Sequence, residues 1–205
     1  MKIDAVTVSI DYSDYLQKII SNKELLDNWL IVTHKDDKKT IKVCKDNKLN
    51  FIYSQKIYEN AVFAKSKAIN EGLEHLNPDD WILQLDSDAK LPDNFKTVIS
   101  ENVKNKNIIY GSRRYDDMGN DIGIITGMPY KGAVGFFQLW HSSAKNRYTL
   151  TEHTNAEGDV DHDQSFEDRC ILPLHIIDVQ DKRTNKRVNW YGRGIIGKTR
   201  HTFYK

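Results

Sequence analysis

The chain has 205 residues, of which 39% are hydrophobic and 29% charged, and its formal net charge is +1. This length and balance predict one globular domain with a real core, and the near-zero charge argues against a whole surface built for polyanions. No apolar run approaches the roughly 20 residues of a membrane span, and no signal peptide is visible. We therefore expect a cytoplasmic protein without a membrane anchor of its own. Cys44 and Cys170 are too few for a disulfide framework and are expected to be reduced and buried.

The first 110 residues alternate short apolar segments with helical patterns. We expect strands at residues 3–10, 29–33, 50–54, 81–85 and 107–110, with helices from about residue 13, over 59–76 and over 92–103. Strands separated by helices predict a mainly parallel sheet in an α/β fold. In such sheets ligands bind beyond the carboxyl ends of the strands, where the loops at 11–14, 34–39 and 86–88 would converge.

The remaining residues, 111–205, are less periodic. They are rich in glycine and aromatic side chains and include an acidic segment at 152–168. We interpret 1–110 as the α/β half of a single domain and 111–205 as its second half. The last segment, 182–205, carries eight Lys or Arg and no Asp or Glu, so it is locally basic.

The strongest chemical signal is Asp86-Ser87-Asp88, directly after an apolar strand. Carboxylates two residues apart at a strand end point roughly the same way. Their mutual repulsion must be offset by a cation or by hydrogen-bond donors. Mg²⁺ and Mn²⁺ prefer such oxygen ligands and are usually shared with substrate phosphates. The alternative interpretation is a surface turn that caps a helix.

A family resemblance begins at this motif. The segment 81–95 (WILQLDSDAKLPDNF) resembles the metal-binding strand and loop of family 2-like glycosyltransferases with the GT-A fold. Residues 6–12 and 31–37 look like the first two nucleotide-binding strands of that family. Residues 63–73 are similar to its helix with a basic residue and an Asn before a Gly, here Lys65, Asn70 and Gly72. The order of these matches implies a GT-A-type nucleotide-diphospho-sugar transferase fold, with 1–110 as its nucleotide-sugar-binding half and 111–205 as its acceptor and catalytic half.

The resemblance implies a donor site for a nucleotide diphosphate sugar, with a UDP-sugar preferred. Asp86 and Asp88 would hold Mn²⁺ or Mg²⁺ against the diphosphate, as metal-assisted transfer requires. Asp11 and Asp36 would contact the base and ribose. The donor is also expected to contact Lys65, Asn70, Ser87, Gln138, Trp190 and Arg193.

Two segments of the second half extend the resemblance. Residues 135–141 (GFFQLWH) fall where the family lines its donor-sugar pocket. There, Phe136 and Leu139 fit a core strand, whereas Gln138 and His141 are both candidates to face the site. Residues 161–166 (DHDQSF) resemble the acidic motif that supplies the catalytic base. Asp163 matches the family's Asp, but His162 replaces its usual Glu, so Asp161, Glu167 and Asp168 remain alternatives.

The last third offers further ligands. His175 resembles a late histidine that completes the metal shell in related enzymes, with His201 as its rival. Residues 189–193 (NWYGR) are similar to segments that end some short family members. There, Trp190 would stack on a sugar or base, and Arg193 would approach the diphosphate.

Together these features predict a metal-dependent glycosyltransferase, and the resemblance implies inversion at the anomeric carbon. The acceptor would be a glycan or hydroxymethylated DNA, the latter as in virus-encoded enzymes. A nucleotidyltransferase is one alternative, although the loop after its first strand usually carries glycines and residues 11–14 have none. A non-catalytic sugar- or nucleic-acid-binding module on the same fold is the other.

Overall fold

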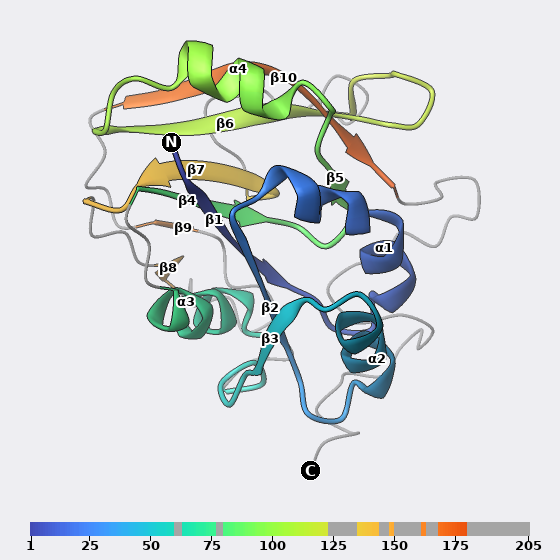
Figure 1. The fold of residues 1–205 in the computed structure, drawn as a ribbon. Coiled ribbons are helices and arrows are strands. Elements are labelled where there is room, and N and C mark those ends of the chain that lie inside the picture. Colours follow the sequence, from blue (N-terminus) through green and yellow to red (C-terminus); the bar gives the residue numbers. More distant parts are fainter. Residues whose placement is uncertain are drawn as a thin grey trace.

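A computed structural model describes residues 1–59, 63–76, 80–122, 135–143, 148–149, 161–162 and 168–179. An eight-stranded sheet in the order β3-β2-β1-β4-β7-β6-β10-β5 forms its centre, and β8 and β9 form a separate two-stranded sheet (Figure 1). No helix in these ranges is long and apolar enough to cross a membrane. The strands are β1 (Ile3–Val8), β2 (Asn28–Thr33), β3 (Asn50–Tyr53), β4 (Trp81–Leu85), β5 (Ala89–Lys90), β6 (Ile108–Tyr115), β7 (Phe137–His141), β8 (Tyr148–Thr149), β9 (Asp161–His162) and β10 (Asp168–Asp178). The helices are α1 (Ser13–Lys18), the 3₁₀ helix η1 (Ile20–Leu25), α2 (Lys38–Asp46), α3 (Lys65–His75) and α4 (Phe95–Asn102).

The first half of the sheet is parallel, which confirms the α/β prediction. β3, β2, β1 and β4 lie side by side with parallel pairing throughout. Helix α2 was not predicted, and its first two residues fall in the segment 34–39 that was expected to be a loop. Its first turn is held by Asp37, whose side chain accepts a hydrogen bond from the amide of Thr40. Helices α3 and α4 begin later than expected, at Lys65 and Phe95.

The second half of the sheet mixes directions. β7 runs antiparallel to both β4 and β6, and β10 runs parallel to β6. β10 is 11 residues long, although it lies in the part of the chain that the sequence analysis described as less periodic. Its side chains at 172, 174 and 176 are buried and those at 173 and 175 exposed, which is the two-residue period of a strand with one covered face.

Two apolar cores cover the two faces of the sheet. Neighbouring residues of β1 alternate between them, Ala5 in one core and Val6 in the other. Helix α3 packs on β1 and β2 so closely that a Cβ at Gly72 would lie 2.5 Å from a methyl group of Val6. This close approach is the structural reason for a glycine here.

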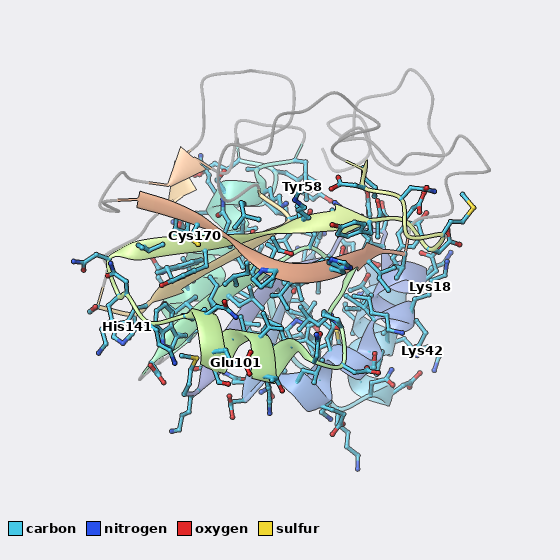
Figure 2. All side chains as sticks on the ribbon, turned by 90° about the horizontal axis from the view of Figure 1, so that it is seen from above. Lys18, Lys42, Tyr58, Glu101, His141 and Cys170 are labelled. Carbon is cyan, nitrogen blue, oxygen red and sulfur yellow. The ribbon has the colours of Figure 1, made fainter. Side chains whose placement is uncertain are left out.

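The two cysteines differ in environment. Cys44 is buried in α2, as expected, and burial raises the pKa of its thiol to about 12, with the nearby Asp37 carboxylate adding to the effect. Cys170 is exposed, contrary to the prediction (Figure 2). Among the described residues, β5 pairs with β10 only at Ile177 and Asp178, so Cys170 has a neighbouring strand, β6, on one side alone.

Candidate active site

The paired acids occupy a tight turn at the carboxyl end of β4. The amide of Asp86 donates to the carbonyl of Phe136, and the carbonyl of Asp86 accepts from the amide of Ala89. The carbonyl of Asp88 accepts from the amide of Val179. Ser87 and Asp88 are buried. The backbone therefore holds both acids between β7 and β10, beyond the ends of the parallel strands.

Asp86 is paired with Lys65, a residue that the family resemblance assigned to the donor site. The Nζ of Lys65, at the start of α3, lies 2.6 Å from Oδ1 of Asp86 and 3.4 Å from the carbonyl oxygen of Gly135. The side-chain amide of Gln84 donates to the same Oδ1 at 3.1 Å. Both side-chain partners therefore use one oxygen of Asp86, and among the described residues Oδ2 has no hydrogen-bond partner.

Asp88 is paired with Arg114 of β6, a residue that the sequence analysis missed. The Nη2 of Arg114 lies 2.6 Å from Oδ1 of Asp88, and its Nε lies 3.3 Å from Oδ2 of Asp178 in β10. The guanidinium also stands over the ring of Phe136, 5.2 Å from the centroid. Burial alone would lower the pKa of Arg114, but Asp88, Asp178 and Asp86 outweigh it, and the pKa is raised. Arg114 therefore stays charged.

A second group of polar residues follows β1 and β2. Asp11 has a φ of 54°, a left-handed conformation that Asp tolerates better than most residues. Its amide donates to Oδ2 of Asp37 at 2.7 Å. Asp37 is buried, whereas Asp36 is half exposed and lies 3.5 Å from a ring nitrogen of His34. Asp37 thus shapes the β1 loop, and the predicted contact of Asp36 with a base or ribose stays a prediction.

Buried hydroxyl groups without hydrogen-bond partners lie in the same region. In the described part of the chain they belong to Ser9 after β1, Thr33 at the end of β2 and Thr40 in α2. Most buried polar atoms in proteins are paired, with protein or with water. Ser9 and Thr33 therefore mark the strand ends as a place where a polar ligand or water completes the structure.

The other predicted donor contacts fall at different distances from the acids. Asn70 is half-buried in α3. Gln138 is buried in β7 directly opposite Gln84, whose amide contacts Asp86, so it lies near the site. His141 lies opposite Trp81, at the other end of β4, and 3.6 Å from Asp80. At about 3.4 Å per residue this places His141 more than 10 Å from the acids, and it is not a site residue.

His175 has a different neighbour from the one expected. It is exposed and stacks on the ring of Tyr115, with 4.4 Å between centroids. Among the described residues no three His, Cys, Asp or Glu side chains form a group that would hold a metal. The role of His175 as a metal ligand therefore stays a prediction. Asp163, Trp190 and Arg193, together with the rivals Glu167 and His201, lie outside the described residues.

The paired acids nevertheless offer the donor chemistry of a divalent ion. Mg²⁺ and Mn²⁺ take one or two carboxylates and complete their shell with phosphate oxygens and water. Asp86 has an open oxygen, and the turn presents Asp86 and Asp88 together. These two residues would hold the ion, with the diphosphate supplying further ligands.

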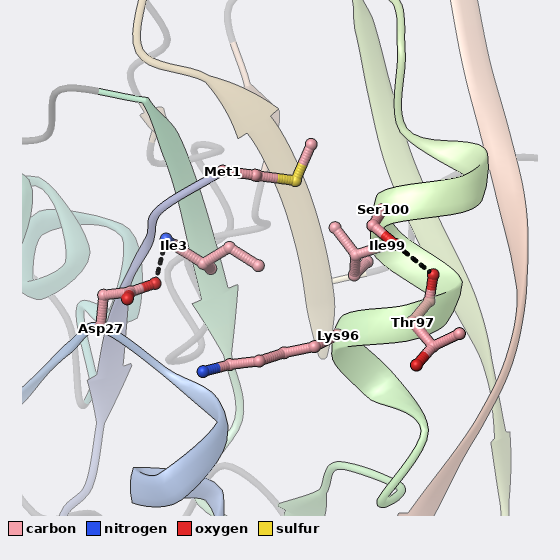
Figure 3. Close-up of a pocket in the computed structure, with 7 residues that line it drawn as sticks. All are labelled: Met1, Ile3, Asp27, Lys96, Thr97, Ile99 and Ser100. Carbon is pink, nitrogen blue, oxygen red and sulfur yellow. Dashed lines mark hydrogen bonds between the residues drawn. The ribbon is translucent and has the colours of Figure 1, made fainter.

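One cavity of about 370 Å³ lies elsewhere, between the amino-terminal ends of β1 and β2 and helix α4 (Figure 3). It is formed by the start of β1, the segment before β2 and one side of α4. The carboxylate of Asp27, which borders it, already accepts the amide of Ile3. The lining residues are Met1, Ile3, Asp27, Lys96, Thr97, Ile99 and Ser100. This cavity is separate from the paired acids.

No protein-family model matches the sequence, and no curated protein shows significant sequence similarity. Solved structures do match. A mannosyl-3-phosphoglycerate synthase from Rubrobacter xylanophilus is 15% identical, with 69% of this chain and 53% of that chain covered and a TM-score of 0.50. A mycobacterial protein is 11% identical, with 68% and 53% covered and a TM-score of 0.50.

A third structure is the glucosyl-3-phosphoglycerate synthase from Mycobacterium tuberculosis in complex with Mn²⁺, uridine diphosphate and glucosyl-3-phosphoglycerate. It is 14% identical, with 62% of this chain and 47% of that chain covered and a TM-score of 0.47. The chain thus spans about half the length of the solved structures it matches. The fold is the mixed α/β GT-A type of nucleotide-sugar transferases, as the sequence predicted.

Proposed function

We propose that the chain is a metal-dependent glycosyltransferase that moves a sugar from a nucleotide diphosphate sugar to an acceptor hydroxyl. The observation that carries this proposal is the turn after β4, where Asp86 and Asp88 lie together with the cations Lys65 and Arg114 on a GT-A-type fold. Such a mixture of fixed anions and cations suits a metal-diphosphate group better than a neutral ligand.

On the donor side, Asp11 and Asp36 contact the base and ribose, and the unpaired hydroxyls of Ser9 and Thr33 offer hydrogen bonds at the same strand ends. Asp86 and Asp88 hold Mn²⁺ or Mg²⁺ against the diphosphate. When bound, this ion supplies Lewis-acid stabilisation of the leaving group. A UDP-sugar is the preferred donor.

In the transfer step, the acceptor oxygen bonds to the anomeric carbon while the bond from that carbon to the diphosphate oxygen breaks. The proton of the acceptor hydroxyl passes to Asp163, and the nucleoside diphosphate leaves. Attack from the face opposite the leaving group inverts the configuration. Lys65 and Arg193 share the charge of the leaving diphosphate. Ser87, Asn70, Gln138 and Trp190 complete the donor site, and His175 is the further candidate metal ligand.

The acceptor is a glycan or hydroxymethylated DNA. Both offer a primary or secondary hydroxyl to an activated sugar. The basic segment 182–205 favours a negatively charged acceptor if it faces the site, because Lys and Arg bind phosphate groups. Comparing transfer to neutral glycans with transfer to hydroxymethylated DNA at two salt concentrations separates the two.

The test is release of nucleoside diphosphate from a panel of nucleotide sugars with Mn²⁺ or Mg²⁺, with and without EDTA. We expect slow hydrolysis of one donor, lost on addition of EDTA and in Asp88→Ala. Asp93→Ala is the matched control, because Asp93 is an exposed acid of the following loop. Asp163→Asn should retain donor binding but lose transfer.

Two other outcomes point to the alternatives. Release of pyrophosphate from a nucleoside triphosphate with a sugar phosphate would identify a nucleotidyltransferase. Donor binding without turnover, even with glycans and hydroxymethylated DNA present, would identify a non-catalytic module. If no donor binds with or without metal, the glycosyltransferase proposal is wrong.

A further inference from the structure

Arg114 occupies a cage of acids that the proposed chemistry does not explain by itself. Its guanidinium contacts Asp88 and Asp178 at 2.6 and 3.3 Å, and Asp86 adds a third negative charge nearby. The side chains of Arg114, Asp88 and Asp178 are only 16%, 6% and 8% exposed. Charged groups this deeply buried are held by their mutual attraction, since water contributes little.

The cage is also fixed by the backbone. Asp178 pairs with Ala89 through the short ladder between β10 and β5, next to the turn that carries Asp88. The amide of Val179 donates to the carbonyl of Asp88, so the two acids are linked on either side of the guanidinium. The ring of Phe136 closes one face of it. The side chain of Arg114 is thus fixed by three segments: the turn with Asp88, the end of β10 with Asp178, and Phe136 before β7.

We propose that Arg114 is the resident cation of Asp88, so that the protein without nucleotide does not bind a divalent ion at the paired acids. An ion on Asp88 would bring two further positive charges within contact distance of the guanidinium. A diphosphate brings the negative charge that offsets this repulsion, so the ion enters with the nucleotide. This inference relies on the proposed function for the identity of the ligand, but not for the cage.

The same geometry has a consequence for variants. Replacing Arg114 by a neutral residue removes the cation that lies between Asp88 and Asp178, whereas Asp86 keeps its own pair with Lys65. Without the guanidinium, the negative charge of Asp88 and Asp178 favours a cation at the vacated position, and carboxylate oxygens suit a divalent ion. Removal of Arg114 therefore raises the affinity for a divalent ion in the absence of nucleotide.

The experiment uses Mn²⁺ alone, without nucleotide or sugar. Free Mn²⁺ is measured by electron paramagnetic resonance, and the melting temperature is followed with and without the ion. We expect the natural chain to bind Mn²⁺ with a Kd weaker than about 1 mM, and Arg114→Met to bind at least about tenfold more tightly and to melt higher with Mn²⁺. Adding Asp178→Asn to Arg114→Met should reverse most of the gain.

Two controls define the comparison. Arg113→Met removes the neighbouring arginine, which is exposed and paired with Asp121, and should leave Mn²⁺ binding as in the natural chain. Arg114→Lys keeps a cation in the cage and should also bind weakly. If Arg114→Met does not fold, the measurement on the natural chain and on Arg114→Lys still decides.

The proposal is overturned if the natural chain binds Mn²⁺ alone with a Kd below about 100 µM and Asp88→Asn abolishes that binding. It is equally overturned if folded Arg114→Met gains no affinity. Because neither measurement involves sugar transfer, a failed search for a donor would leave this inference standing. Conversely, tight Mn²⁺ binding by the natural chain would leave the glycosyltransferase proposal intact.

Discussion

The parallel half of the sheet (β1 to β4) and its mixed half (β6, β7 and β10) each supply a different cation to the paired acids Asp86 and Asp88. In the parallel half, β1 to β4 follow one another in sequence, and α3 leads directly to β4. That half supplies Lys65, which pairs with Asp86. The mixed half inserts β7 between β4 and β6 and supplies Arg114, which pairs with Asp88. Two acids of one short turn are thus neutralised by different halves, and long-range contacts complete the site.

The largest effect should come from breaking the mixed-half pair. Arg114→Met leaves Asp88 and Asp178 buried without their cation, and we expect the free energy of unfolding to fall by about 3–5 kcal/mol. Urea denaturation followed by tryptophan fluorescence measures it. Arg113→Met, which removes a guanidinium that is half exposed to water and pairs with Asp121, should cost less than about 1 kcal/mol. Equal costs for the two variants would show that the cage does not stabilise the mixed half.

The parallel half should respond to overpacking. Gly72→Ala places a Cβ about 2.5 Å from Val6 and 2.8 Å from Val32, between α3 and the sheet. We expect a loss of about 2 kcal/mol, because the shift this demands outweighs the gain in helix propensity. Glu74→Ala on the exposed side of the same helix should change stability by less than about 0.5 kcal/mol. A stabilised Gly72→Ala variant, measured in the same urea experiment, would mean that α3 moves freely on β1 and β2.

The parallel-half pair should be weaker than its counterpart. Lys65→Met removes the cation from Asp86, but that carboxylate keeps the Gln84 amide and is 21% exposed to water. We expect a loss of about 1–2 kcal/mol in the free energy of unfolding, smaller than for Arg114→Met. Lys67→Met is the matched control, because it removes a partly exposed lysine of the same helix whose ammonium pairs with Glu59. If Lys65→Met proves the more costly change, the contrast between the two halves is reversed.

The same contrast explains what the sequence could predict. The strands and the β4 turn are visible in the local sequence as apolar runs followed by polar residues, and Lys65 was predicted as a donor contact from the family resemblance of residues 63–73. Arg114 lies in the run Arg113–Asp117, which looks like an ordinary charged surface. Nothing local says that it meets Asp88 and Asp178, because strand pairing across the sheet brings them together.

Helix α2 and strand β10 were missed or underestimated for other reasons. In α2 the apolar face has only a few members among lysines, and its start depends on Asp37 as a cap. The alternating Leu172, Leu174 and Ile176 of β10 were a readable strand signal, hidden by the proline and histidine between them. Asp37 itself was readable as a helix cap, but its bond to the Asp11 amide was not, because that bond depends on the turn after β1.

The smallest expected effect concerns His141, at the end of β7 far from the acids, where β7 pairs with β4 and so connects the two halves of the sheet. Burial lowers the pKa of His141, Lys106 lowers it further, and Asp80 only partly opposes this. Since the folded-state pKa lies below the ordinary value of about 6.5, the unfolded chain takes up the proton first as the pH falls. Stability from this group is therefore complete above about pH 7 and decreases as the pH falls through the ordinary pKa of histidine.

We expect urea denaturation at pH 7.5 and 5.5 to reveal this loss as a contribution below about 1 kcal/mol, absent in His141→Gln. His75→Gln, which removes an exposed imidazole of α3, is measured alongside as a second histidine variant. A steeper fall in stability at low pH in His141→Gln would mean that the protonated imidazole is stabilised by Asp80. An ion pair between His141 and Asp80 would then stabilise this end of β4 and β7. The pairs of Asp86 and Asp88 with their cations would do the same at the opposite end.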